Sequence, residues 1–368
     1  MPAQSKSTEY CLMNKDTLVL TFLCCRNAFD EPEFTELGWA TDLRPLGYTD
    51  LTAFLEHRKA PKHREHIRAL LEQFGCDDLE GFLRVSHALS LGDTFWVKEA
   101  ASSLRWTEVS LYRNEFNRLI SEAAFDGTVS ETDISSASPE FGTDGYYAKC
   151  WMREGGKIFL YKTGSALYET EPLSEYLASQ LAGIICPNAV HYDLGFYHDR
   201  LISKCELFTS EQRGLAKASS VFHGEVTIPR LLDYFASIGS EEDFRRMCVL
   251  DALTFNPDRH YGNFGVLFDT DTMRVLGMAP VFDNNRALFP ELDEAQLASP
   301  EWYLQKCKPR IGRDFVLTAR GLLTPELRAE LKNLEGFCFA EHSTIELPRK
   351  RLALLSELVN RRIGEIIE

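Results

Sequence analysis

The sequence has no pair of cysteines at metal-binding spacing and no long apolar run. Its ten cysteines include no Cys-x-x-Cys pair, the arrangement that completes most structural zinc sites. Most of them stand among apolar residues, which predicts reduced, buried thiols in a cytoplasmic protein. The longest apolar stretch, residues 17–25, is too short to cross a bilayer. The first six residues lack the apolar segment of a secretory signal, so we expect a cytoplasmic protein without membrane contact.

Basic residues are scarce relative to acidic ones. Lys and Arg number 40 against 55 Asp and Glu, which gives a formal net charge of −15. Because an acidic surface repels phosphates, this charge argues against direct binding of nucleic acid or of an anionic membrane. The composition, 44% hydrophobic and 26% charged, is otherwise that of a folded protein with a sizeable core.

No internal repeat or low-complexity tract divides the chain, but one polar stretch does. Residues 126–140 are rich in Ser, Thr and acidic side chains and are typical of a linker or loop. We therefore predict an N-terminal accessory α/β region over residues 1–130. A small β-rich lobe over residues 135–206 and a helical lobe over residues 207–368 should follow.

The apolar patterns within these parts predict an α+β protein of two lobes with an extra N-terminal region. Pro172 should open an amphipathic helix, since proline is tolerated in a first turn. Beyond residue 206 the pattern is mostly helical. The expected elements are strand 18–23, helices 50–58 and 63–74, strand 94–97, hairpin 147–162, helix 172–185, strands 190–196 and 200–204, helix 241–255 and helix 348–367.

The densest group of chemically active side chains follows the helix expected over residues 241–255. That helix should stop at an Asn-Pro pair, which disfavours helical continuation. The next loop carries Asp258 and, five residues on, Asn263. Asp283 comes twenty residues later, where we expect the end of an apolar strand.

Phosphoryl transfer requires such a set. One carboxylate, here Asp258, must accept the proton of an attacking hydroxyl, while an amide oxygen and a second carboxylate hold Mg²⁺. The five-residue spacing is that of the protein-kinase catalytic loop, Asp-x-x-x-x-Asn. The alternative is a helix-terminating turn whose Asp and Asn only satisfy backbone groups.

A kinase also needs a lysine on a strand and a glutamate on the following helix. Lys162 and Glu175 occupy these places; the alternative is an exposed lysine at the end of a strand and an exposed glutamate on a helix. A phosphate-covering loop should precede the hairpin, and residues 141–145 are the candidate, with Thr143 and Gly145 as nucleotide contacts. A plain β-turn would also explain its two glycines.

At these residues the sequence resembles the HipA-like serine/threonine kinases, toxin-type kinases that share a fold core with protein and phosphoinositide kinases. The resemblance is carried by Asn-Pro-Asp-Arg-His-Tyr-Gly-Asn-Phe-Gly at 256–265, Asp283 after Pro-Val-Phe, Ser-Glu-Tyr-Leu-Ala at 174–178 and Leu-Ile-Ser-Lys-Cys-Glu at 201–206. Residues 138–149 and 90–96 are similar to the phosphate loop and an N-terminal segment of a subgroup.

The resemblance implies a bilobal kinase-like fold and a transfer of the γ-phosphate of ATP, with Mg²⁺, to a protein hydroxyl. It implies a small antitoxin partner in toxin–antitoxin members. Some members phosphorylate a serine of their own glycine loop, and Gly142, which stands near that place here, departs from this pattern. Because a Ser/Thr-rich stretch runs directly into the phosphate loop, we expect self-modification, where it occurs, between Ser135 and Thr143, with Thr143 as the first candidate. The implied roles are Asp258 as base, Asn263 and Asp283 as metal ligands, Lys162 as phosphate contact, His260 as a structural or nucleotide-proximal residue, and Lys204, Cys205 and Glu206 as the hinge that reaches adenine.

Two other readings stay open. A small-molecule or phosphoinositide-type kinase is the first, because Asp-Arg-His-x-x-Asn also resembles a phosphoinositide-kinase loop. Apart from residues 349–351, however, no basic cluster offers a way onto an anionic membrane. The second is an inactive kinase-fold binding module, which would have no need of Asp258, Asn263, Asp283 and Lys162 together.

Overall fold

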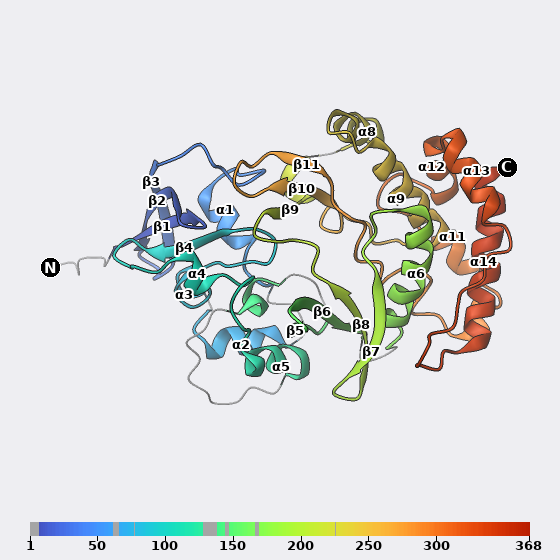
Figure 1. Ribbon diagram of the computed structural model, residues 1–368, viewed down its shortest axis with the longest axis horizontal. Coiled ribbons are helices and arrows are strands. Elements are labelled where there is room, and N and C mark those ends of the chain that lie inside the picture. Colours follow the sequence, from blue (N-terminus) through green and yellow to red (C-terminus); the bar gives the residue numbers. More distant parts are fainter. Residues whose placement is uncertain are drawn as a thin grey trace. The chain divides into compact units, whose positions relative to one another are not determined.

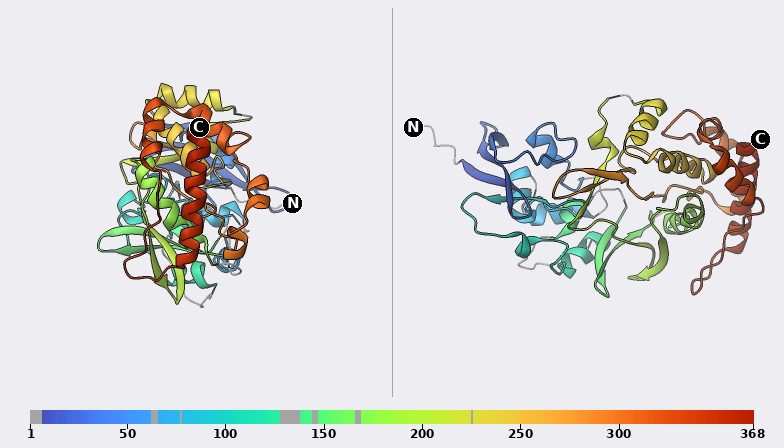
Figure 2. Two further views of the ribbon diagram at one scale, coloured as in Figure 1. Left: turned by 90° about the vertical axis from the view of Figure 1, so that its right-hand side faces the viewer. Right: turned by 45° about the horizontal axis from the view of Figure 1, so that its top comes forward.

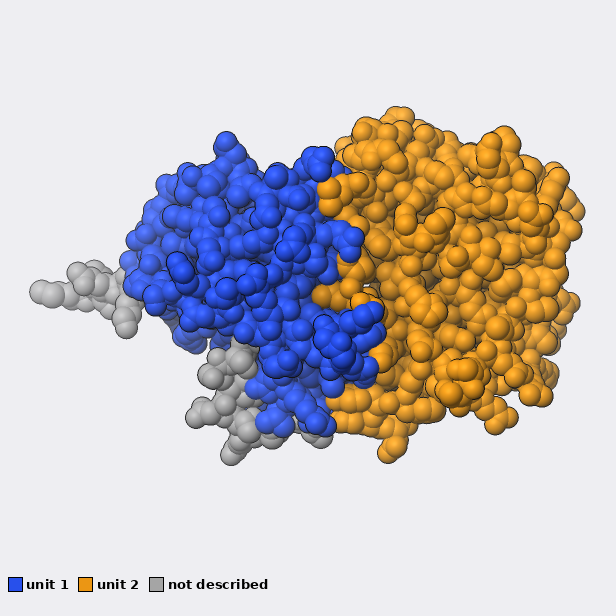
Figure 3. Space-filling model, in the orientation of Figure 1, with its two compact units in different colours: residues 1–161, 209–216, 268–275 blue, residues 162–208, 217–267, 276–368 orange. Residues whose placement is uncertain are grey.

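The computed structural model describes residues 7–61, 66–76, 78–127, 138–143, 147–165, 169–224 and 226–368. The chain forms two compact units whose segments alternate along the sequence (Figure 3). The first unit comprises residues 1–161, 209–216 and 268–275, and the second comprises residues 162–208, 217–267 and 276–368.

A four-stranded antiparallel sheet in the order β3-β2-β1-β4 opens the first unit (Figure 1). Its strands are β1 (Thr8–Asn14), β2 (Thr17–Arg26), β3 (Pro32–Trp39) and β4 (Phe95–Glu99). The predicted strands at 18–23 and 94–97 correspond to β2 and β4, whereas β1 and β3 were not predicted. In β3 no residue is buried, so an apolar pattern could not reveal it.

Short helices complete the first unit: α1 (Leu51–Glu56), α2 (Ile67–Gln73), α3 (Leu79–Ser86), α4 (Trp106–Val109), α5 (Arg118–Asp126) and the 3₁₀ turn η1 (Pro139–Gly142). Asp50, Asp78 and Asn117 start α1, α3 and α5, because each side chain accepts hydrogen bonds from the first backbone N–H groups. A core that includes Phe22, Phe82 and Phe141 joins these helices to the sheet.

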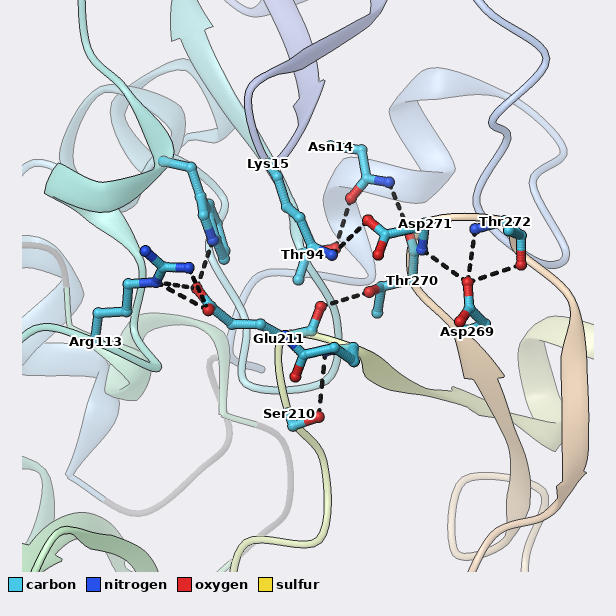
Figure 4. A network of polar contacts seen from close by, with 12 residues as sticks. Asn14, Lys15, Thr94, Arg113, Ser210, Glu211, Asp269, Thr270, Asp271 and Thr272 are labelled. Atoms are coloured by element: carbon cyan, nitrogen blue, oxygen red, sulfur yellow. Dashed lines mark hydrogen bonds and ion pairs between the residues drawn. The ribbon is translucent and has the colours of Figure 1, made fainter.

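Glu211 ties a later part of the chain into this unit (Figure 4). Its carboxylate accepts hydrogen bonds from Trp106 Nε1 at 2.6 Å and Ser110 Oγ at 2.9 Å. It also accepts two-pronged contacts from Arg113, the shortest at 2.7 Å. The Glu211 carbonyl in turn accepts from Thr270 Oγ1, so one residue joins three separate segments of the unit.

Two further sheets are present, with strand orders β5-β6-β8-β7 and β11-β10-β9. The strands are β5 (Lys149–Glu154), β6 (Lys157–Thr163), β7 (Tyr192–Tyr197), β8 (Arg200–Glu206), β9 (Arg213–Lys217), β10 (Gly265–Asp269) and β11 (Val275–Met278). The predicted hairpin and the strands before residue 206 agree with the first of these sheets. Beyond that residue most of the described elements are helices, as predicted, and the short strands β9, β10 and β11 form there as well.

The helices of the second unit are α6 (Glu171–Ile185), α7 (Ala218–Val221), α8 (Ile228–Ser237), α9 (Glu241–Leu253), α10 (Glu294–Leu297), α11 (Glu301–Lys306), α12 (Phe315–Leu322), α13 (Pro325–Asn333) and α14 (Arg349–Ile367). Pro172 lies in the first turn of α6, as predicted. Helix α14 runs as one long terminal helix (Figure 2). In the described part of the chain, no helix has the length and apolarity that crossing a membrane requires.

Candidate active site

Three predicted site residues form one chain of ion pairs in the second unit. The ammonium of Lys162, near the end of β6, lies 2.5 Å from Glu175 Oε1 on α6 and 3.0 Å from Asp283 Oδ1. Burial alone lowers the pKa of a lysine, but the two carboxylates outweigh it, so the pKa of Lys162 lies above its usual value. Lys162 therefore stays charged between two acidic groups. Neither Lys162 nor Glu175 is the surface residue of the alternative interpretation, since they are 5% and 0% exposed.

The burial of Glu175 comes from the position of α6, which packs against β7, β8 and α9. Burial raises the pKa of the Glu175 carboxyl, and the neighbouring Lys162 ammonium opposes that rise. Ser203, on β8, donates a hydrogen bond to Glu175 Oε2 at 2.6 Å. Both oxygens of the carboxylate are thus occupied, which fixes it against Lys162. Ser203 lies in the segment 201–206 that resembles the hinge, but its contact with Glu175 was not predicted.

The surroundings of Asp283 differ from the prediction. Residues 280–282 do not form a strand, and Asp283 has a φ of +58°, a left-handed conformation outside the β region. The Val281 carbonyl accepts from Val190 N–H, and the Asp283 N–H donates to the Tyr192 hydroxyl at 3.0 Å. The backbone groups of residues 281 and 283 therefore each bind a separate partner and do not pair with a neighbouring strand.

The catalytic-loop residues follow α9 as predicted. The half-buried Asp258 and the buried Asn263 are linked, because Asn263 Nδ2 donates to the Asp258 carbonyl at 3.0 Å. This bond turns the amide oxygen of Asn263, the atom that could ligate a metal ion, away from that carbonyl. Among the described residues, none hydrogen bonds to the Asp258 carboxylate. His260 is exposed, and its Nδ1 accepts from the Gly262 N–H, which gives it a structural role within the loop.

Arg259 joins this loop to the Asp283 segment, a link that sequence reasoning missed. Its guanidinium is 1% exposed and pairs with the Asp251 carboxylate of α9 at 3.0 Å. It also donates to the Asn263 carbonyl at 2.9 Å, to the Phe282 carbonyl at 2.5 Å and to Asn284 Oδ1 at 2.5 Å. A buried arginine with this many acceptors fixes both candidate metal ligands through the main chain. The position of Arg259 inside the catalytic-loop motif was the feature of the sequence that could have indicated this role.

The expected hinge residues lie at the end of β8. Cys205 is buried opposite Tyr192 in the β7–β8 pair, and burial raises the pKa of its thiol to about 12, so it stays protonated. Lys204 is half-buried and Glu206 is exposed. The nearby Lys162 ammonium partly opposes this rise in the pKa of the Cys205 thiol.

The candidate phosphate loop belongs to the first unit. Gly145 lies outside the described residues. The Thr143 hydroxyl donates to the Pro139 carbonyl at 2.7 Å and accepts from Trp151 Nε1 at 2.9 Å. At Gly142 a Cβ atom would stand 2.9 Å from the Arg58 carbonyl oxygen, which explains why no hydroxyl-bearing residue occupies that position.

The residues that could hold a metal ion are Asn263 and Asp283. Carboxylate and amide oxygens are the hard ligands that Mg²⁺ prefers, and two protein ligands with nucleotide phosphates are typical of its sites. The described residues contain no cluster of three or more His, Cys, Asp or Glu side chains that would form an all-protein cage. The donor set thus fits Mg²⁺ shared with a nucleotide.

Comparisons with known proteins point to kinases. A serine/threonine-protein kinase CtkA of Helicobacter pylori is 26% identical over 142 residues, which are 34% of this chain and 43% of that protein. The chain thus spans less than half the length of this relative. A crystal structure of a proinflammatory kinase CtkA from H. pylori matches 60% of this chain and 91% of that chain at 18% identity, with a TM-score of 0.44. No family model matches the sequence.

The fold is similar over nearly the whole chain to that of HipA from Shewanella oneidensis MR-1, solved with HipB and operator DNA. That match covers 97% of this chain and 99% of HipA, with a TM-score of 0.54 and 12% identity. The expected kinase-like α+β fold is therefore confirmed. In fold the chain is similar to HipA, and in sequence it is similar to a named serine/threonine kinase.

Proposed function

We propose that this protein is an ATP- and Mg²⁺-dependent serine/threonine protein kinase. The observation that carries the proposal is the ion-pair chain of Glu175, Lys162 and Asp283, which supplies a fixed cation and a metal-binding carboxylate in one unit. A binding module needs no buried, charged lysine held between two carboxylates, because such groups are costly to desolvate. The sequence similarity to a serine/threonine kinase supports the same reaction class.

In this proposal each residue has one role. Lys162 contacts nucleotide phosphates, and Asn263 and Asp283 hold Mg²⁺, which neutralises charge on those phosphates. Asp258 takes the proton of the attacking hydroxyl. The hydroxyl oxygen then bonds to the γ-phosphorus of ATP, and ADP leaves. The end of β8, with Lys204, Cys205 and Glu206, serves as the adenine-facing hinge. Thr143 and Gly145 belong to the phosphate-covering loop, and His260 shapes the catalytic loop.

For partners, we propose a protein substrate and an antitoxin-type protein. HipA was solved with HipB and operator DNA, which motivates the antitoxin partner. The net charge of −15 argues that any DNA contact is made by that partner and not by this chain. A cytoplasmic location is part of the proposal. A phosphoinositide-type kinase is the second candidate, favoured only by the Asp-Arg-His-x-x-Asn motif.

The test is transfer of labelled γ-phosphate by the wild-type protein and the Asp258→Asn variant. Loss of a general base costs about 10²- to 10⁴-fold in rate. Because the Asp258 carboxylate is half-buried and bonds to no described residue, nucleotide affinity and the thermal midpoint should stay unchanged. Offering a protein lysate and phosphoinositide vesicles in parallel separates the two substrate classes. Equal transfer by both proteins would refute the role of Asp258.

A further inference from the structure

Asp283 adopts a conformation that its surroundings must hold. A left-handed backbone is uncommon for a residue with a side chain, although Asp tolerates it better than most. The direction of the Asp283 carboxylate depends on this φ value, because the side chain leaves from the same Cα atom. Whatever fixes the main chain of Asp283 therefore also aims the carboxylate.

Hydrogen bonds hold the residues on both sides of Asp283 and the N–H of Asp283 itself. Arg259 binds the Phe282 carbonyl before it and the Asn284 side chain after it. The Asp283 N–H donates to the Tyr192 hydroxyl at 3.0 Å. Arg259 also pairs with Asp251 and serves the Asn263 carbonyl, so its removal would disturb the whole loop. Tyr192 offers a contact that can be removed with little other change.

Tyr192 lies where it can act on several site residues. It is 2% exposed on β7, directly opposite Cys205 on β8, and its ring centre is 5.1 Å from the Lys162 ammonium. Burial places the pKa of its hydroxyl well above the usual value, so the proton stays on. The hydroxyl can therefore donate toward Cys205 while its oxygen accepts from Asp283.

We infer that Tyr192 is a positioning residue whose hydroxyl fixes the main chain of Asp283 so that its carboxylate is presented to Mg²⁺. This inference rests on the proposed function, in which Asp283 is a metal ligand. Tyr192 itself touches neither metal nor nucleotide in this role, and it acts only through Asp283.

The test compares Tyr192→Phe with the matched control Tyr303→Phe, whose hydroxyl accepts from Gln296 on α10 at 2.8 Å. Binding of a non-hydrolysable ATP analogue is titrated against Mg²⁺, and hydrogen exchange of residues 280–286 is measured without ligand. Loss of one hydrogen bond predicts that Tyr192→Phe raises the half-saturating Mg²⁺ concentration about three- to tenfold, with similarly faster exchange at Asp283. Analogue affinity without Mg²⁺ and both properties of Tyr303→Phe should match the wild type.

Each other outcome overturns the inference. Faster exchange with an unchanged Mg²⁺ requirement would make Tyr192 a structural residue only. Unchanged exchange would show that Arg259 and the Val190–Val281 backbone bond fix the segment without Tyr192. If the wild-type protein binds no analogue at any Mg²⁺ concentration, the proposed function fails and the inference fails with it. That case is recognised in the wild type, before any variant is compared.

Discussion

The ammonium of Lys162 lies 3.0 Å from Oδ1 of Asp283, a residue 121 positions further along the chain. The same ammonium pairs with the fully buried Glu175 at 2.5 Å. One cation therefore compensates two carboxylates, and a change at any of the three residues alters the charge balance of the other two.

Replacing Lys162 should affect stability and nucleotide binding by separate routes. Lys162→Met leaves Glu175 buried without its partner, which costs about 3–5 kcal/mol of unfolding free energy. It should also weaken ATP binding and slow turnover, because the phosphate contact is lost. The double variant Lys162→Met/Glu175→Gln should regain most of the stability but not the ATP affinity. Chemical denaturation and ATP titration measure the two effects. Wild-type ATP affinity in either variant would make Lys162 a purely structural residue.

Asp283 and Asn263 should differ as metal ligands. Asp283→Ala removes a carboxylate that no methyl group can replace, so Mg²⁺-dependent ATP binding should fall by more than the roughly 10- to 100-fold that loss of an outer-shell partner costs. Asn263→Ala should weaken it less, because a neutral amide is the poorer ligand. Asp283→Asn is the matched control that keeps the shape of the side chain. ATP affinity is measured at a series of Mg²⁺ concentrations. If Asp283→Ala retains the wild-type Mg²⁺ response, Asp283 is not a ligand.

Glu211 should make the unfolding free energy of the protein depend on pH below neutrality. Burial alone would raise its pKa, but hydrogen bonds from Arg113, Ser110 and Trp106 outweigh it and hold the pKa of Glu211 below the usual 4.5. A lowered carboxyl pKa stabilises the fold fully above pH 4.5, and this stabilisation is lost as the pH falls through the lower, folded value. At neutral pH, Glu211→Gln should cost about 1–3 kcal/mol.

The difference between wild type and Glu211→Gln should therefore shrink as the pH falls below 4.5. Unfolding free energies at a series of pH values measure it. Glu72→Gln is the control, since Glu72 forms an exposed ion pair with Arg68 in the same unit and should cost little at any pH. A Glu211→Gln penalty that is constant down to pH 2 would contradict the assignment.

The catalytic loop could be predicted from residue spacing within one short segment. The rest of the site depends on contacts between segments that are far apart in the sequence. Asp258 and Asn263 are separated by a single loop, so their spacing alone places them together. Tyr192 on β7 and Asp251 on α9 contact site residues from elements outside the loop, and no spacing rule connects them to the site. Lys162 and Glu175 were found because a strand and the next helix are neighbours in the chain.

The prediction of a strand over residues 280–282 was wrong, again because long-range contacts decide the structure there. Residues 280–282 have the apolar composition of a strand, but Arg259 and Tyr192 bind the carbonyl of Phe282 and the N–H of Asp283. At these two groups side chains take the place of a neighbouring strand, while Val281 still pairs with the backbone of Val190. Composition does not show which partner a backbone group will find. The strand β3 escaped prediction for the opposite reason, since its hydrogen bonds form without a buried face.

The chain changes units after residues 161, 208, 216, 267 and 275, and this has a practical consequence for fragments of the protein. A truncation that begins at residue 135 would keep all the candidate site residues. It would also remove Trp106, Ser110 and Arg113 and leave the Glu211 carboxylate without these donors. A fragment of residues 1–161 would lack Glu211 itself, and with it the acceptor for Trp106 Nε1. Neither unit can be produced as one continuous piece of chain. A loss of phosphate transfer after deletion of the N-terminal region would therefore first have to be separated from a loss of folding.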